Sequence, residues 1–142
     1  MSQVDVSYGI LHYNPDGKTQ PYFAFEKAVR SLAANATLSR EVFVIDQGNC
    51  EREARRSHDL ANELGFHFIG LKRNVGISRG INLLANMARG RYVSLVTSDV
   101  EFTPNLDTNL VQTLEANTDI WQICPASDQS DIIYQKHHFQ SS

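Results

Sequence analysis

The sequence predicts an α/β fold in which a mostly parallel β-sheet carries helices on both faces. Apolar runs rich in β-branched residues alternate along the chain with segments whose apolar residues recur at helical spacing. The first run ends in strong turn signals, Asn14-Pro15 and Asp16-Gly17. Such alternation of strands and helices favours parallel strands joined by right-handed crossovers.

Composition limits the class of protein. The chain has 142 residues, enough for one domain with a hydrophobic core but not for two, and a hydrophobic content of 42% is ordinary for a soluble protein. A net charge of −3 argues against binding to nucleic acid through its phosphates. The sequence shows neither a signal peptide nor a membrane span. Two cysteines are too few for a disulfide framework, so we expect a reducing, cytoplasmic compartment.

The first half of the chain predicts three strands and two helices. The expected strands cover residues 4–11, 42–45 and 66–71, and the first is expected at the centre of the sheet because it is mostly apolar. A helix is predicted over residues 20–36, with Thr19 as its N-cap residue. A second helix is predicted to begin at Asn49 as N-cap residue and to end at Gly65.

The second half predicts two more helices and two more strands. The helix after Gly76 should face the core with Ile77, Ile81, Leu84, Ala85 and Ala88. Gly76 and Gly80, four residues apart, predict its close approach to the sheet or a ligand. Residues 92–96 are interpreted as a buried strand, Pro104-Asn105 as the opening of a fourth helix, and residues 120–124 as a fifth strand. We therefore expect one domain over residues 1–125 and a polar tail over residues 126–142.

Polar side chains follow the predicted strands where the chain turns into each helix. Because the strands are parallel, these turns lie at one edge of the sheet, where α/β proteins bind ligands. The residues gathered there are Tyr13, Asn14, Asp46, Arg73, Asn74 and Asp99. A helix N-terminus beside Arg73 is a natural anion site. Asp99 and Glu101 are hard carboxylates that suit a divalent cation carrying phosphate.

Each of these features also has a plainer interpretation. Asp46 can simply form the turn before Gly48, and Lys72-Arg73 can be a solvated pair. Asp99 can cap a turn while Glu101 lies in water. The first turn contains neither a Gly-x-Gly-x-x-Gly loop nor a Walker loop, which argues against a nicotinamide dinucleotide site and a P-loop.

Four segments in this order resemble the family 2 glycosyltransferases, which have the Rossmann-like GT-A fold. The segments are Ile10–Asn14, Val42–Asn49, Arg73–Asn82 and Ala88–Val100, and the resemblance covers about residues 4–104. It implies a nucleotide-diphospho-sugar transferase fold, truncated here at the C-terminus. It also implies a UDP-type sugar donor, Mg²⁺ or Mn²⁺, and transfer of the sugar to an acceptor that the sequence does not identify.

The resemblance also implies roles for individual residues. Tyr13 and Asn14 match the turn that packs around the base, and Asp46 matches the aspartate that hydrogen-bonds a uracil-type base. Asp99 matches the acid that holds the metal ion, with Glu101 in the second acid position. The remaining nucleotide-binding candidates are Arg73, Asn74, Gly76, Asn82 and Ser98.

The chain departs from the family pattern in ways that bear on activity. Gln47 stands where a second acid is common. Family members continue into an acceptor-binding half with the catalytic base, which takes the proton of the attacking hydroxyl. The acids and histidines left for that role lie in no recognisable motif: Asp128, Asp131, His137 and His138. The alternative to a transferase is a truncated nucleotide-binding or interaction module, completed by a partner or by self-association.

Overall fold

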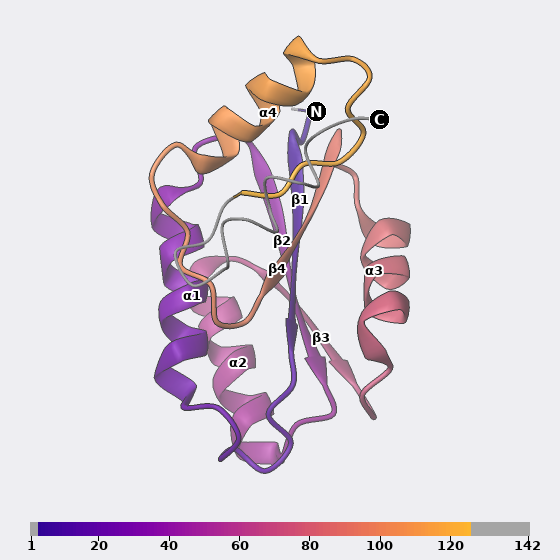
Figure 1. Ribbon diagram of the computed structural model, residues 1–142. Coiled ribbons are helices and arrows are strands. Elements are labelled where there is room, and N and C mark those ends of the chain that lie inside the picture. Colours follow the sequence, from indigo (N-terminus) through magenta and orange to yellow (C-terminus); the bar gives the residue numbers. More distant parts are fainter. Residues whose placement is uncertain (1–2, 126–142) are drawn as a thin grey trace. The chain divides into compact units, whose positions relative to one another are not determined.

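The computed structural model describes residues 3–125, along which strands and helices alternate (Figure 1). The strands are β1 (Val6–His12), β2 (Arg40–Gln47), β3 (His67–Leu71) and β4 (Tyr92–Thr97), and the helices are α1 (Tyr22–Asn35), α2 (Glu51–Leu64), α3 (Gly76–Met87) and α4 (Leu106–Ala116). The predicted alternation is confirmed as far as α4. The prediction of a fifth strand over residues 120–124 is wrong, because these residues form no strand. The tail predicted for residues 126–142 lies outside the described residues.

The strands form one parallel sheet in the order β3-β2-β1-β4. The prediction of a mostly parallel sheet is confirmed, and so is the central position of β1. The prediction that the strand over residues 92–96 is buried is wrong. In the described part of the chain β4 pairs only with β1, and Val93 and Leu95 expose 49% and 38% of their surface, whereas Val96 is buried. An apolar strand at the edge of a sheet keeps only part of its surface from water.

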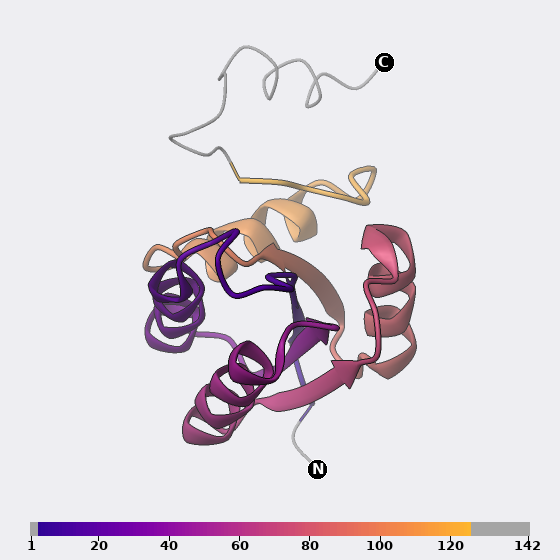
Figure 2. The same cartoon turned by 90° about the horizontal axis from the view of Figure 1, so that it is seen from below.

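Helices cover both faces of the sheet, as predicted. Figure 2 shows α1 and α2 on one side of the sheet and α3 on the other. Alternate residues of β1 explain this division. The ring of His12 stacks on Phe25 of α1 with the centroids 3.9 Å apart. On the opposite face, a side chain on Gly9 would clash with Leu84 of α3, so this glycine lets α3 pack directly on the strand.

The side of α3 that faces the core differs from the predicted one. Leu84 is fully buried as predicted, but Ile77 and Ile81 expose 67% and 39% of their surface. Gly80 faces the sheet, where an added Cβ would lie 2.8 Å from the Leu11 side chain. The predicted close approach is therefore confirmed at Gly80, whereas nothing lies within 4 Å of a Cβ added to Gly76. Because α3 meets β1 most closely at Gly80, Ile77 and Ile81 lie away from this contact and remain exposed.

The predicted helix ends are partly correct. The N-cap residue of α1 is Pro21 rather than Thr19, and that of α2 is Cys50 rather than Asn49. The side chain of Asn49 is engaged at the edge of the sheet and cannot also cap the helix. Gly65 ends α2 in the left-handed conformation with φ of 71°, as predicted.

The chain divides into two compact units after Pro104. The first unit contains the sheet, α1, α2, α3 and every residue of the site described below. The second contains α4, whose N-cap residue is Asn105, so the predicted opening of this helix is confirmed. Among the described residues, no helix combines the length and the apolar character that a membrane crossing requires.

Candidate functional site

Polar side chains lie at the carboxyl ends of β1, β2 and β4. The strand register places His12, the last residue of β1, beside Asp46 of β2. Asn14 is the second residue after β1, and Ser98 comes directly after β4. The parallel topology therefore brings the predicted residues Asn14, Asp46 and Ser98 to one edge of the sheet.

Asn14 is the most connected residue of this edge and is fully buried. Its Nδ2 donates hydrogen bonds to the Gln20 carbonyl (2.8 Å) and to Glu53 Oε2 (3.1 Å), and its Oδ1 accepts one from the Gln20 backbone N–H (3.1 Å). Its own backbone N–H donates to Asn49 Oδ1 at 2.6 Å. The residue therefore closes the loop over residues 14–20 and fastens it to the start of α2.

Asp46 is 2% exposed and forms a turn with the residues that follow it. Its Oδ1 accepts hydrogen bonds from the backbone N–H groups of Gly48 and Asn49, both at 3.1 Å, and its Oδ2 accepts one from Asn49 Nδ2 at 2.7 Å. The same Nδ2 donates to the His12 carbonyl at 3.2 Å. The turn-forming interpretation is therefore correct. A carboxylate has about four acceptor positions, so one remains for a ligand.

The turn after β2 lies against the loop after β3. Gly48 has φ of 77°, and a Cβ added to it would lie 2.7 Å from Arg73 Cα. Beside this contact, Gln47 Oε1 accepts a hydrogen bond from the Val75 backbone N–H at 3.1 Å. The structure therefore brings the backbone of Arg73 to the turn of Asp46, while the Arg73 side chain is exposed.

Other predicted residues of the edge are open to solvent. Tyr13 exposes 47% of its surface. The exposed Asn74 accepts a hydrogen bond from the Gly76 backbone N–H at its Oδ1 (2.8 Å), which shapes the start of α3. Asn82 is exposed in the middle of α3, and in the described structure it does not take part in the hydrogen-bond network around Asn14.

The residues after β4 include the two acids predicted to hold a metal ion. Ser98 Oγ donates to Gln20 Oε1 at 3.2 Å and so joins β4 to the loop that Asn14 closes. Asp99 is exposed, whereas Glu101 Oε1 lies 2.7 Å from Lys27 Nζ. The described residues contain no cluster of three or more potential metal ligands. Mg²⁺ often takes only one or two carboxylates and completes its shell with phosphate and water, so Asp99 suits such an ion, and Glu101 suits it once Lys27 is released.

A buried ionisable pair that the sequence did not reveal lies beneath Asn14. His12 Nε2 is 3.5 Å from Glu53 Oε2, and both side chains are fully buried. Within the described structure, both ring nitrogens of His12 and Oε1 of Glu53 have no hydrogen-bond partner. Burial lowers the pKa of His12, although the carboxylates of Glu53 and Asp46 act to raise it. His12 is therefore neutral at pH 7.

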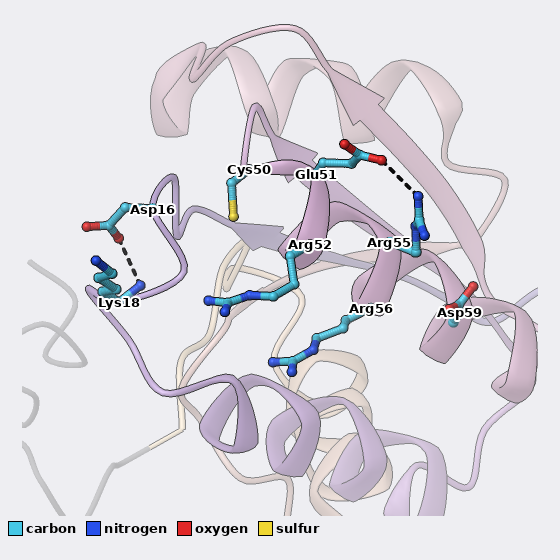
Figure 3. A pocket seen from close by; sticks show the side chains of 8 residues that line it. All are labelled: Asp16, Lys18, Cys50, Glu51, Arg52, Arg55, Arg56 and Asp59. Atoms are coloured by element: carbon cyan, nitrogen blue, oxygen red, sulfur yellow. Dashed lines mark hydrogen bonds and ion pairs between the residues drawn. The ribbon is translucent and has the colours of Figure 1, made fainter.

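An open depression of about 700 Å³ lies beside the first turns of α2 (Figure 3). Arg55 pairs there with Glu51 at 2.8 Å. Asp16 Oδ1 accepts the Lys18 backbone N–H at 2.9 Å, and this hydrogen bond lowers the pKa of Asp16. The lining consists of Asp16, Lys18, Cys50, Glu51, Arg52, Arg55, Arg56 and Asp59, and it includes none of the predicted nucleotide-binding residues. The depression is therefore not the site that the sequence predicts.

Comparisons with known proteins agree with this architecture. A family model described as glycosyl transferase family 2 matches residues 24–141. Among the solved structures that resemble the chain is S. aureus TarS 1-349, which is 18% identical with a TM-score of 0.65, over 87% of this chain and 39% of that one. The same protein in complex with UDP is 18% identical with a TM-score of 0.65, over 92% of this chain and 44% of that one. The mannosyltransferase PcManGT from Pyrobaculum calidifontis in complex with GDP-Man and Mn²⁺ is 17% identical with a TM-score of 0.63, over 80% of this chain and 33% of that one. At these identities the likeness shows the fold, which is of the GT-A type. The chain spans less than half the length of each of these proteins, and no curated protein matches it.

Proposed function

Because the chain belongs to glycosyl transferase family 2, we propose that it binds a nucleoside-diphosphate sugar at the edge formed by β1, β2 and β4. The observation that carries the proposal is the hydrogen-bond network that joins Asn14, Asp46 and Ser98 through Gln20 and Asn49. The expected donor is of the UDP type. The UDP in the TarS complex and the GDP-Man in the PcManGT complex support this class of ligand.

Each residue of the edge has a definite part in the proposal. The exposed ring of Tyr13 packs against the base, while Asn14 fixes the loop on which Tyr13 lies. The remaining acceptor position of Asp46 receives an N–H group of the base. Arg73 and the N-terminus of α3 attract the diphosphate, because free backbone N–H groups and a cation favour an anion. Further candidates for nucleotide contact are Asn74, Gly76, Asn82 and Ser98.

Asp99 is the proposed ligand for Mg²⁺ or Mn²⁺, with Glu101 as the assisting carboxylate. A divalent cation held there would offset the negative charge that develops on the departing diphosphate. Glu101 can assist only when its ion pair with Lys27 opens. The variant Lys27→Met should therefore tighten the binding of Mn²⁺ in the presence of UDP. An unchanged Mn²⁺ affinity would remove Glu101 from the metal site.

Transfer of the sugar to an acceptor hydroxyl is the proposed reaction. The four residues that the sequence offers as a base lie outside the described part of the chain. A second candidate function is nucleotide binding without transfer, alone or completed by a partner or a second copy. Release of free sugar or glycosylated acceptor from a UDP-sugar distinguishes the two functions.

We also propose a reducing, cytoplasmic location for the protein. Cys50 and Cys124 are both free thiols in the structure. Free cysteines are typical of compartments in which thiols are kept reduced. Mass spectrometry of the protein alkylated at the moment of cell lysis should find both thiols modified, and a disulfide in that sample would contradict the location.

Calorimetric titration with UDP, with and without Mn²⁺, tests the nucleotide site. We expect UDP to bind only with Mn²⁺ and GDP to bind more weakly. Asp99→Ala should abolish the metal-dependent binding without unfolding the protein, because the residue is exposed. Asp59→Ala, an exposed aspartate on α2, is the matched control and should bind like the parent. Absence of binding at millimolar UDP and GDP, or parental binding by Asp99→Ala, would overturn the assignment.

A further inference from the structure

Glu53 links the candidate site to a fully buried imidazole. Its Oε2 accepts a hydrogen bond from Asn14 Nδ2 at 3.1 Å and lies 3.5 Å from His12 Nε2. Asn14 has no exposed surface, so its amide group depends on these protein partners rather than on water. The ring of His12 is held in place by stacking on Phe25. The carboxylate is therefore shared between the loop over residues 14–20 and a group that can take up a proton.

Few charged groups near His12 and Glu53 could take the place of the contact between these two side chains. Within α2, Arg56 Nη1 lies 3.9 Å from Glu53 Oε1, and the Arg56 side chain is half exposed. From β2, the Asp46 carboxylate acts on His12. From α1, burial raises the pKa of Tyr22 to about 12, so its hydroxyl stays uncharged. Tyr22 therefore adds no charge beside His12 and Glu53.

We propose that Glu53 and His12 are positioning residues of the nucleotide site, and that protonation of this pair loosens Asn14 and weakens nucleotide binding. The inference rests on the proposed function. If His12 takes the proton, the imidazolium attracts Oε2 and competes with Asn14 for it. Weakening of this charge-assisted hydrogen bond loosens the Asn14 side chain.

The direction of the pH dependence follows from the burial of His12. Burial lowers the pKa of His12 from its ordinary value of 6.5, so the ring is neutral at neutral pH and nucleotide affinity should be highest there. Affinity is lost only as the pH falls below that value. Hydrogen bonds to charged groups are strong enough that loss of this one should weaken UDP binding about tenfold.

The test measures UDP affinity in the presence of Mn²⁺ at about pH 7.5 and about pH 5.5. Glu53→Ala should bind UDP about tenfold more weakly than the parent at the higher pH. Glu53→Gln keeps an oxygen that can accept from Asn14, so it should retain most of the affinity and lose less of it in acid than the parent does. Glu51→Gln is the matched control, since Glu51 lies in the same turn of α2 and its side chain is 86% exposed.

The control variant also corrects for protonation of UDP itself, which affects every protein equally. The proposal requires the acid loss of the parent to recur in Glu51→Gln and to shrink in Glu53→Gln. An equal acid loss in all three proteins would overturn it, and so would parental affinity in Glu53→Ala.

Hydrogen exchange separates failure of this inference from failure of the proposed function, because it needs no ligand. The backbone N–H groups of Gln20 and Cys50 donate to Asn14 Oδ1 and to the Pro15 carbonyl, so their protection reports on the loop. In the parent, their protection factors should fall in acid while that of the buried Leu32 stays unchanged, and Glu53→Gln should reduce the fall. If UDP does not bind but the loop loosens in this way, only the proposed function fails. Constant protection of the loop would overturn the positioning role.

Discussion

Replacing Gly48 with alanine should disturb the candidate site through the backbone alone. A Cβ at this position would lie 2.7 Å from Cα and 2.9 Å from N of Arg73. Backbone atoms cannot rotate away as the end of a long side chain can, so the turn after β2 or the loop after β3 has to move. Both segments carry candidate nucleotide contacts. The substitution should therefore weaken UDP binding although it removes no side chain.

The energetic cost can be divided with the help of a matched variant, Gly65→Ala. Gly65 has φ of 71°, close to the 77° of Gly48, but nothing lies within 4 Å of its Cβ position. Left-handed strain alone should destabilise Gly65→Ala by about 1–2 kcal/mol. Gly48→Ala carries the same strain together with the collision, which adds about 1–3 kcal/mol. Its total loss of unfolding free energy should therefore be about 2–5 kcal/mol.

Urea unfolding of both variants, followed by circular dichroism, measures the two losses. UDP titration of each variant then tests the link to the site, and only Gly48→Ala should show reduced affinity. Equal losses of unfolding free energy in the two variants would refute the claim that contact with Arg73 limits this position. A destabilised Gly48→Ala that binds UDP like the parent would show that the two loops do not form the nucleotide site.

Two further substitutions test the connections around the sheet edge and its opposite end. Glu41→Gln should lower the unfolding free energy by about 1–3 kcal/mol at neutral pH, because the buried carboxylate accepts hydrogen bonds from Ser7 Oγ (2.7 Å) and Arg89 Nη2 (2.8 Å). Burial acts to raise the pKa of Glu41, but these hydrogen bonds hold it below its ordinary 4.5. The difference in unfolding free energy between the parent and Glu41→Gln should therefore be complete above pH 4.5 and vanish as the pH falls through the lower pKa of the folded state. A pH-independent difference in urea unfolding would contradict this. Asn49→Ala should cost about 1–3 kcal/mol in the same assay, because Asp46 Oδ2 loses its donor, and an unchanged midpoint would show that water replaces the amide.

Local patterns predicted the elements of the fold but not the depth at which each is buried. The apolar stripe of α3 contains Ile77, Ile81 and Leu84, and all three have helical spacing. Which part of such a stripe meets the sheet depends on the closest approach, and Gly80 against Leu11 sets it. A prediction from helical periodicity places apolar residues on the core-facing side and does not count a glycine toward that side, although a glycine permits the closer contact. The rotation of α3 therefore required the structure.

The same limit applies to the candidate site. Asn14 and Asp46 were predicted because each follows an apolar run, and parallel topology makes the ends of such runs converge. Ser98 was added by the family resemblance. Gln20 and Glu53, which connect them to one another and to α2, gave no comparable signal. The contact of Glu53 with Asn14 spans 39 residues and that of Gln20 with Ser98 spans 78, and such pairs are set by tertiary packing rather than by a local pattern.

The buried polar groups beneath the edge follow from the loop above them. A chain that turns back over residues 14–20 buries the amide of Asn14, which then needs an acceptor besides the Gln20 carbonyl. Glu53 supplies that acceptor from the first turn of α2, but a buried carboxylate is costly unless cations or donors surround it. Arg56 and the proton-accepting ring of His12 lie on either side of it. An apolar residue at position 53 would remove the charge but leave the Asn14 amide without its second acceptor, so the loop geometry requires a hydrogen-bond acceptor at this position, and in this chain a carboxylate supplies it.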